Sequence, residues 1–92
     1  MARLGMDAEA VEGVSRRLKS QAEQLRALMN QIGQSVEQAT SVWEGSDSKQ
    51  FHSEWTGHQR RAIEKAVSDI EQLSQKALRN AQRQRETSNN YN

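Results

Sequence analysis

The chain contains two long segments in which apolar residues recur every three or four positions. A repeat of about 3.6 residues places such side chains on one face of an α-helix. The first stripe comprises Val11, Val14, Leu18, Ala22, Leu25, Met29, Ile32, Val36, Ala39 and Trp43. Leu28 and Val42 widen this stripe. The second comprises Phe51, Trp55, Ala62, Ile63, Ala66, Val67, Ile70, Leu73, Ala77, Leu78 and Ala81.

Cap residues locate the ends of these helices. Asp7 is a good N-cap for the first, and Gly45 suits the position after its end because glycine accepts positive φ. Ser46 or Asp47 then caps the second helix, with Gln50 placed for a capping box. We predict helices over 7–44 and 48–86 and a turn at 45–47. An N-terminal segment covers 1–6, and a flexible polar tail covers 87–92.

So short a link forces the two helices to lie antiparallel. The predicted fold is therefore all-α, an antiparallel two-helix hairpin. Gly13 and Gly33 lie inside the first helix, where each costs roughly 1 kcal/mol relative to alanine. Each is either a tolerated surface glycine or a point where the second helix approaches closely.

The two stripes are wider than a lone hairpin can cover, because its flanks stay in contact with water. Two hairpins packed face to face would bury these flanks in a four-helix bundle. We therefore predict that the hairpin pairs into a four-helix-bundle dimer. The residues expected in this core and dimer stripe are Leu18, Leu25, Leu28, Met29, Ile32, Val36, Ile63, Val67, Ile70 and Leu73.

Composition supports this picture and excludes several classes of protein. The 92 residues are 34% hydrophobic, with a mean hydropathy of -1.00 and no proline or cysteine. One small domain of long helices fits these values, whereas a disulfide framework or thiol chemistry does not. No apolar run is long enough to cross a membrane. The first ten residues lack an apolar segment followed by a cleavage site, so we expect no conventional signal peptide.

Candidate catalytic and ligand-binding residues are sparse. His52 and His58 point to different sides of one helix and cannot form the i, i+4 pair of a helical metal site. Glu54 and His58 fit an exposed i, i+4 pair. We predict no catalytic residues, no metal and no cofactor. Basic and acidic residues alternate on the second helix, and the net charge is only +1, so nucleic-acid binding is disfavoured.

A Trp-x-Gly sequence, Trp43-Glu44-Gly45, lies between the two predicted helices. It is followed by a small cap residue, Ser46, and then by Phe51 and Trp55 at helical spacing. Over roughly residues 7–86 this pattern resembles the WXG100 family, the ESAT-6-like proteins. The resemblance implies a non-enzymatic helical-hairpin dimer exported by a type VII (ESX-like) secretion system of a Gram-positive or actinobacterial cell.

The resemblance also implies partners: a second copy or another WXG100 protein, and the secretion ATPase. Trp43, Phe51 and Trp55 either pack as an aromatic clasp on the turn or also form a groove that such a partner recognises. The alternative function is a helical adaptor with no export role. A weaker alternative is a small nucleic-acid-binding protein.

One feature departs from the family. Many members carry Tyr-x-x-x-Asp/Glu just past the second helix, whereas the only tyrosine here, Tyr91, has no acidic residue four positions beyond it. A truncated sequence, a partner that supplies the signal, or a variant signal would each explain the difference.

Overall fold

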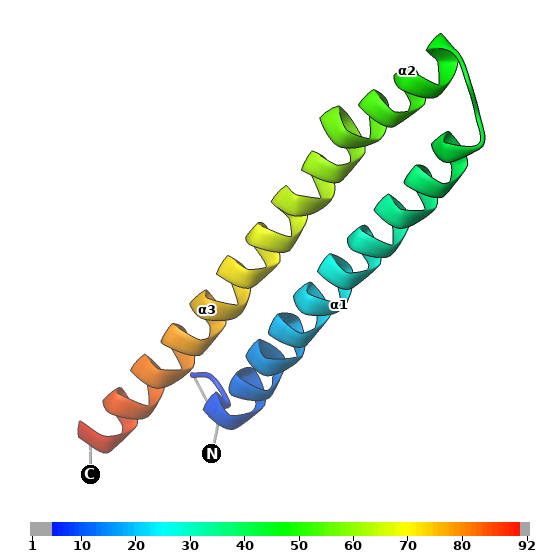
Figure 1. Ribbon diagram of the computed structural model, residues 1–92. Coiled ribbons are helices and arrows are strands. Elements are labelled where there is room, and N and C mark those ends of the chain that lie inside the picture. Colours follow the sequence, from blue (N-terminus) through cyan, green and yellow to red (C-terminus); the bar gives the residue numbers. More distant parts are fainter. Residues whose placement is uncertain (1–4, 91–92) are drawn as a thin grey trace.

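The computed structural model describes residues 5–90, and side chains over 5–87. Helix α1 (Ala8–Ser41) packs against a second rod made of α2 (Ser46–Glu54), the π-helical turn η1 (Trp55–Gln59) and α3 (Arg60–Asn90) (Figure 1). The two rods run antiparallel in a molecule 70 Å long, and residues 5–90 contain no strand. The predicted all-α hairpin is confirmed.

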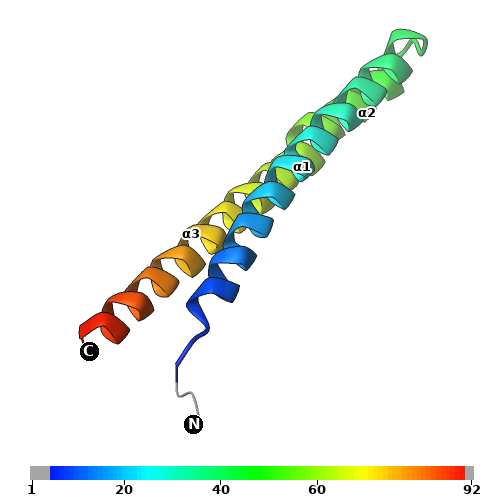
Figure 2. The same ribbon diagram turned by 90° about the horizontal axis from the view of Figure 1, so that it is seen from below.

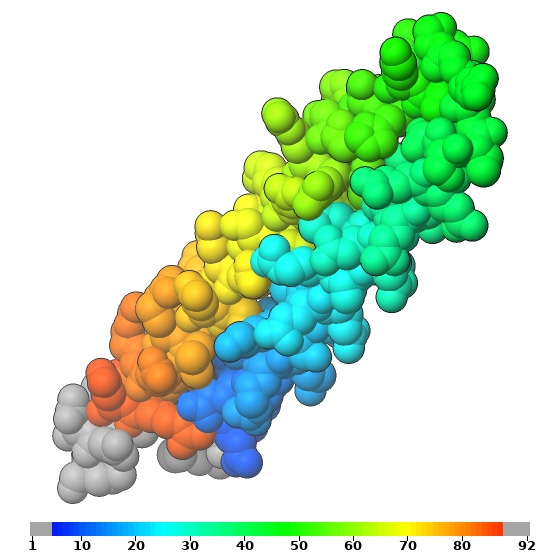
Figure 3. All heavy atoms as spheres, viewed as in Figure 1, coloured from blue at the N-terminus to red at the C-terminus, as the bar shows by residue number. Residues whose placement is uncertain are grey.

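The rods stay in contact along their length. Side chains fill the space between them in Figure 3. In Figure 2, α1 overlies the second rod near the turn and diverges from α3 toward the termini. The rods therefore cross at a shallow angle, as expected for helices that pack in a left-handed sense.

Asp7 begins α1 as predicted. Its backbone is extended, with φ -76° and ψ 96°, and its carboxylate accepts a hydrogen bond of 3.1 Å from the backbone N–H of Ala10. Glu9 adds negative charge to the first turn, where the helix dipole favours it. Of the predicted N-terminal segment 1–6, residues 1–4 lie outside the described part of the chain.

The first helix ends at Ser41, earlier than the predicted Glu44. The Thr40 and Ser41 hydroxyls donate to the carbonyls of Glu37 (3.1 Å) and Gln38 (2.7 Å). The backbone N–H groups of Val42 and Trp43 reach only to the carbonyls three residues back, both at 3.4 Å. Hydroxyl groups bonded to the preceding turn weaken a helix end. The last backbone bonds span three residues instead of four, and this tighter turn ends α1.

Gly45 has the predicted positive φ, but its role differs from the predicted one. Its φ of 108° and ψ of 179° make it the N-cap of α2, with no side-chain cap hydrogen bond. Ser46 and Asp47 therefore lie inside α2 rather than capping it. A four-residue link, Val42–Gly45, replaces the predicted turn at 45–47.

The second helix contains a π-helical turn that the sequence pattern did not predict. The backbone N–H of Arg60 bonds to the carbonyl of Trp55, five residues back. Buried residues recur every seven positions before this turn (Ser48, Trp55) and after it (Val67, Ser74, Ala81). Trp55 and Val67 are one residue out of step for a regular helix at about 100° per residue. The π turn absorbs that residue, so both halves face α1.

The described part of α3 extends to Asn90, past the predicted end at residue 86. The predicted tail 87–92 is thus helical over 87–90, and residues 91–92, which include Tyr91, lie outside the described residues.

Small residues make part of the contact between the rods. The buried positions of α1, which recur every seven residues, are Ser15, Ala22, Met29 and Val36. Ser15 Oγ donates to the Ser74 carbonyl and Ser74 Oγ donates to the Ser15 carbonyl, both at 2.8 Å. This reciprocal pair satisfies both buried hydroxyls and fixes the register of the hairpin.

Larger apolar residues lie beside this seam. Of the predicted core stripe, Met29, Val36 and Val67 are buried, and Met29 and Val36 form a cluster with Trp55. Five are half-buried: Leu18, Leu25, Ile32, Ile63 and Ile70. Leu28 and Leu73 are 49% and 55% exposed, so the isolated hairpin leaves them outside its core.

The half-buried residues all lie on one side of the hairpin. Four of them follow a buried residue by three positions, as Leu25 follows Ala22 and Ile70 follows Val67, and Ile63 precedes the buried Val67 by four. An antiparallel pair has a local two-fold axis perpendicular to its plane, so equivalent positions face the same side. We call this side the apolar face. It comprises Val14, Leu18, Leu25, Leu28, Ile32, Ile63, Ala66, Ile70, Leu73 and Ala77.

Charged residues gather on the opposite side, the polar face. There Arg26 pairs with Glu71 at 3.3 Å, and Arg85 binds Glu12 through two hydrogen bonds of 2.6 and 3.0 Å. By position, every charged residue of α1 except Arg17 lies toward this side. The hairpin therefore has one apolar and one charged face.

Candidate functional site

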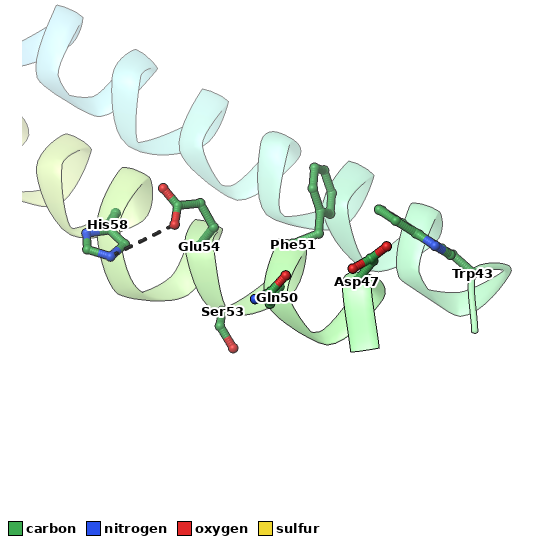
Figure 4. Close-up of a pocket in the computed structure, with 7 residues that line it drawn as sticks. All are labelled: Trp43, Asp47, Gln50, Phe51, Ser53, Glu54 and His58. Atoms are coloured by element: carbon green, nitrogen blue, oxygen red, sulfur yellow. Dashed lines mark ion pairs between the residues drawn. The ribbon is translucent and has the colours of Figure 1, made fainter. Parts of the chain in front are cut away.

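The end of the hairpin at the link presents two exposed aromatic rings. Trp43, in the link, and Phe51, on α2, are 41% and 43% exposed. Their ring centroids are 5.5 Å apart at an interplanar angle of 49°. Figure 4 shows the indole extending over the start of α2 toward Phe51. This spacing is typical of a favourable aromatic pair that keeps part of each ring free for contact.

Trp55 does not join this pair. It is 8% exposed and packs with Met29 and Val36 in the core. Trp43 leaves the helical path because α1 ends at Ser41, whereas Trp55 lies one turn farther along the second rod and faces α1. The structure thus brings together Trp43 and Phe51 of the three aromatic residues and places the third elsewhere.

A groove with an acidic rim runs beside the aromatic pair (Figure 4). Asp47 and Glu54 supply the negative charge, and Glu54 lies 4.0 Å from His58 Nε2 and accepts a 3.2 Å hydrogen bond from Gln59. The exposed Glu54–His58 pair has the predicted i, i+4 spacing. The groove is lined by Trp43, Asp47, Gln50, Phe51, Ser53, Glu54 and His58.

The chemistry of this end suits recognition of a protein surface. Two exposed rings offer apolar contact, and the carboxylates and amides around them can bind basic and polar groups. Val42, 86% exposed, extends the apolar area of the link.

A second groove lies over Trp55, toward the polar face. The Trp55 indole rests on Gly33, where a Cβ atom would lie 3.4 Å from Nε1 of the indole. Gly33 is therefore a point where the second helix approaches closely. At Gly13, by contrast, only Arg16 lies within 4 Å of where a Cβ atom would be. The groove is lined by Met29, Asn30, Gly33, Gln34, Glu37, His52, Trp55, Thr56 and Arg60. The sequence pattern alone had not distinguished Gly33 from Gly13.

Over the described residues, no three His, Cys, Asp or Glu side chains lie together where they could hold a metal ion. None of the helices over residues 5–90 is long and apolar enough to cross a membrane.

A family model described as "WXG100: Proteins of 100 residues with WXG" matches residues 3–88. No curated protein and no solved structure is significantly similar to the chain. The match spans both rods and the link, and it includes the Trp43-Glu44-Gly45 sequence whose tryptophan stands exposed beside Phe51. The chain belongs to the WXG100 family.

Proposed function

We propose that this protein is a small non-enzymatic substrate or partner of a type VII (ESX-like) secretion system and acts as a helical-hairpin dimer. The observation that carries the proposal is the exposed Trp43–Phe51 pair, built on the family's Trp-x-Gly sequence at the link. The hairpin fold itself needs a glycine at position 45 but does not need an indole at position 43. Exposure of so large a ring at the tip is therefore best explained by recognition.

The apolar face supports the dimer. Leu28 and Leu73 are exposed on the same side as five half-buried leucines and isoleucines. A contiguous apolar face of this kind on a soluble domain usually marks an interaction surface. A second hairpin placed on it would complete a four-helix bundle, with the Trp43–Phe51 end left accessible to the secretion ATPase.

Export can be tested in a Gram-positive or actinobacterial host with and without the secretion ATPase. We expect the wild-type protein in the culture supernatant only when the ATPase is present. Trp43→Ala should stay in the cells while keeping its helical content by circular dichroism, because Trp43 lies outside the core. Leu78→Ala, an exposed position on the polar face, is the matched control and should be exported normally. Equal export without the ATPase would overturn the proposal.

A further inference from the structure

The indole N–H of Trp55 has no hydrogen-bond partner among residues 5–87. Trp55 is 8% exposed, so nearly all of its side chain is buried between the rods. Over the same residues, every fully enclosed side-chain nitrogen or oxygen has a partner. Nε1 of Trp55 is therefore not enclosed, and it opens onto the groove on the polar face, the Trp55 groove. An N–H in this position needs an acceptor, from water or from a ligand.

Gly33 keeps this N–H accessible. A Cβ atom at residue 33 would lie 3.4 Å from Nε1 of Trp55 and 3.9 Å from Cε2 and Cζ2. Because Nε1 is the ring atom nearest to that position, a methyl group there would take up space from which an acceptor approaches the N–H. A glycine within a helix costs roughly 1 kcal/mol relative to alanine, and at this position it leaves the donor open.

The π turn brings a cation to the same groove. The backbone N–H of Arg60 bonds to the carbonyl of Trp55, so the two residues are neighbours along the rod. In a regular α-helix, Gln59 would hold the place of Arg60. Arg60 pairs with Glu64 through Nε at 3.1 Å, but its side chain is 48% exposed and a guanidinium has five N–H donors. Arg60 can therefore also bind a ligand, as is common for residues at π turns.

The walls of the Trp55 groove are polar. Side-chain amides offer both donors and acceptors, so they can pair with the main-chain N–H and C=O groups of a peptide. An amphipathic helix would need an apolar groove instead, and its main-chain groups are already bonded to one another. These walls therefore favour an extended peptide. The polar residues that form them are Asn30, Gln34 and Glu37 on α1 and His52, Thr56 and Arg60 on the second rod.

The groove carries one charge toward each end. Gly33 contacts Trp55, so these two residues mark the same level of the rods. Glu37 lies four residues beyond Gly33 toward the link, and Arg60 lies five residues beyond Trp55 in the opposite direction. At about 1.5 Å per residue, the charges are roughly 13 Å apart along the rods. Four steps of an extended peptide also span about 13 Å and bring both side chains to the same face.

We infer that the Trp55 groove binds an extended peptide segment of a partner protein. A main-chain carbonyl of the segment accepts from Nε1 of Trp55. An acidic side chain of the segment binds Arg60, and a basic side chain four residues away binds Glu37, which makes no ion pair over residues 5–87. This inference goes beyond the proposed function, because the groove lies on the polar face and stays open when a second hairpin covers the apolar face.

The two tryptophans allow a direct test. In a proton–nitrogen NMR correlation spectrum, Trp43 and Trp55 each give one indole signal, and Trp43→Phe identifies which is which. The probe is acetyl-Lys-Thr-Ala-Thr-Glu-amide, whose threonines favour an extended chain. At millimolar concentration we expect it to move the Trp55 signal downfield, because the N–H gains a hydrogen bond, and to leave the Trp43 signal in place.

Two variants remove access to the N–H or the N–H itself. Gly33→Ala should raise the dissociation constant of the peptide at least about tenfold, because it obstructs a buried donor. The same variant should be more stable than the wild type, so a folding defect cannot account for the loss. Benzothienylalanine in place of Trp55, in a Trp43→Phe chain, keeps the ring shape without the N–H. It should weaken binding as strongly, followed through the side-chain amide signals of Asn30 and Gln34.

The charged ends are tested separately. Arg60→Gln and Glu37→Gln should each raise the dissociation constant about threefold, as for an exposed ion pair. Arg61→Gln and Glu23→Gln make the same chemical changes outside the groove and should leave binding unchanged. Peptides with two lysines or two glutamates at the charged positions should bind the wild type about threefold more weakly.

An unmoved Trp55 signal at millimolar peptide, a shift of the Trp43 signal instead, or undiminished binding by Gly33→Ala would each overturn the inference. Tighter binding of an alanine-rich helical peptide would also overturn it. In that peptide, lysine and glutamate eight positions apart have a similar separation of about 12 Å, but the main-chain carbonyls are occupied. None of these results bears on ATPase-dependent export, which the supernatant assay measures separately.

Discussion

At the scale of single residues, two glycines and one tryptophan shape the end of the hairpin. Gly45 provides a backbone conformation that reverses the chain, and Gly33 provides the space in which the Trp55 indole lies. Gly57, in the π turn, has nothing within 4 Å of a built Cβ atom. Glycine identity therefore matters for different physical reasons at positions 45 and 33.

Gly45 should resist substitution by every other residue. Its φ of 108° and ψ of 179° lie in a region that is essentially restricted to glycine. We expect Gly45→Ala to lower the free energy of unfolding by about 1–3 kcal/mol. Gly45→Asn should be no better, since asparagine tolerates the left-handed helical region but not this one. Urea denaturation measures both, and a stable Asn variant would show that the turn is left-handed helical instead.

Gly33 should tolerate alanine but not leucine. A Cβ atom there meets Trp55 Nε1 at 3.4 Å, an ordinary contact, so Gly33→Ala should stabilise the helix by roughly 1 kcal/mol. Gly33→Leu should displace the indole and destabilise the fold by about 1–3 kcal/mol. Urea denaturation in a Trp43→Phe background isolates the Trp55 emission.

Gly13 is the control for this comparison, because only Arg16 lies within 4 Å of its built Cβ. Gly13→Ala should give a gain similar to that of Gly33→Ala, and Gly13→Leu should cause no comparable loss. Equal stabilities of the leucine variants at positions 13 and 33 would contradict the packing of Trp55 on Gly33.

At the scale of elements, the two rods meet through a seven-residue repeat of buried side chains, which are small toward the termini and larger toward the link. The predicted stripe emphasised leucine and isoleucine, whereas Ser15, Ala22, Ser74 and Ala81 form much of the seam. Their spacing of seven is present in the sequence and could have identified them, because a seven-residue repeat marks the seam along which two helices pack. The hydrogen bonds between Ser15 and Ser74 depend on pairing two distant segments, which periodicity within one helix does not specify.

The Glu12–Arg85 ion pair joins the two rods near the termini and should make stability depend on pH. The hydrogen bonds from Arg85 hold the pKa of the Glu12 carboxyl below its usual value of 4.5. A carboxyl whose pKa is lower in the folded state stabilises the fold above the unfolded pKa, and this contribution is lost as pH falls through the folded value. The contribution of this pair should therefore begin to fall near pH 4.5 and be lost as the pH drops through the lower pKa of the folded state.

Arg85→Gln should raise the Glu12 pKa toward its usual value, as measured by NMR titration of the side-chain carboxyl. Lys65→Gln is the control, because it breaks the Lys65–Asp69 pair within α3 and leaves Glu12 untouched. An unchanged Glu12 pKa in Arg85→Gln would contradict the bidentate contact.

At the scale of the whole molecule, the segregation of charged and apolar residues to opposite faces favours association through one face only. Leu28 and Leu73 on the apolar face and Leu78 on the polar face are 49%, 55% and 39% exposed. These leucines contribute little to the core of the isolated hairpin. Substitutions at them therefore test association without unfolding the hairpin.

Leu28→Glu/Leu73→Glu should convert the proposed dimer to a monomer with unchanged helical content, because charges at the proposed interface would be buried without partners. Leu78→Glu should dimerise like the wild type. Sedimentation at micromolar concentration distinguishes these outcomes. A double variant that still dimerises would place the interface elsewhere on the hairpin.

The sequence by itself determined the hairpin: two helical stripes, the Asp7 cap, and a glycine link too short for any arrangement but an antiparallel one. These features depend on interactions within a few residues, which local patterns record. Tertiary packing decided the rest. It placed Trp55 in the core and left Trp43 with Phe51 at the tip, because the end of α1 and the π turn together set which side of each rod faces the other. Which side of each rod faces the other depends on contacts between segments far apart in sequence. A periodic pattern within one helix carries no information about those contacts.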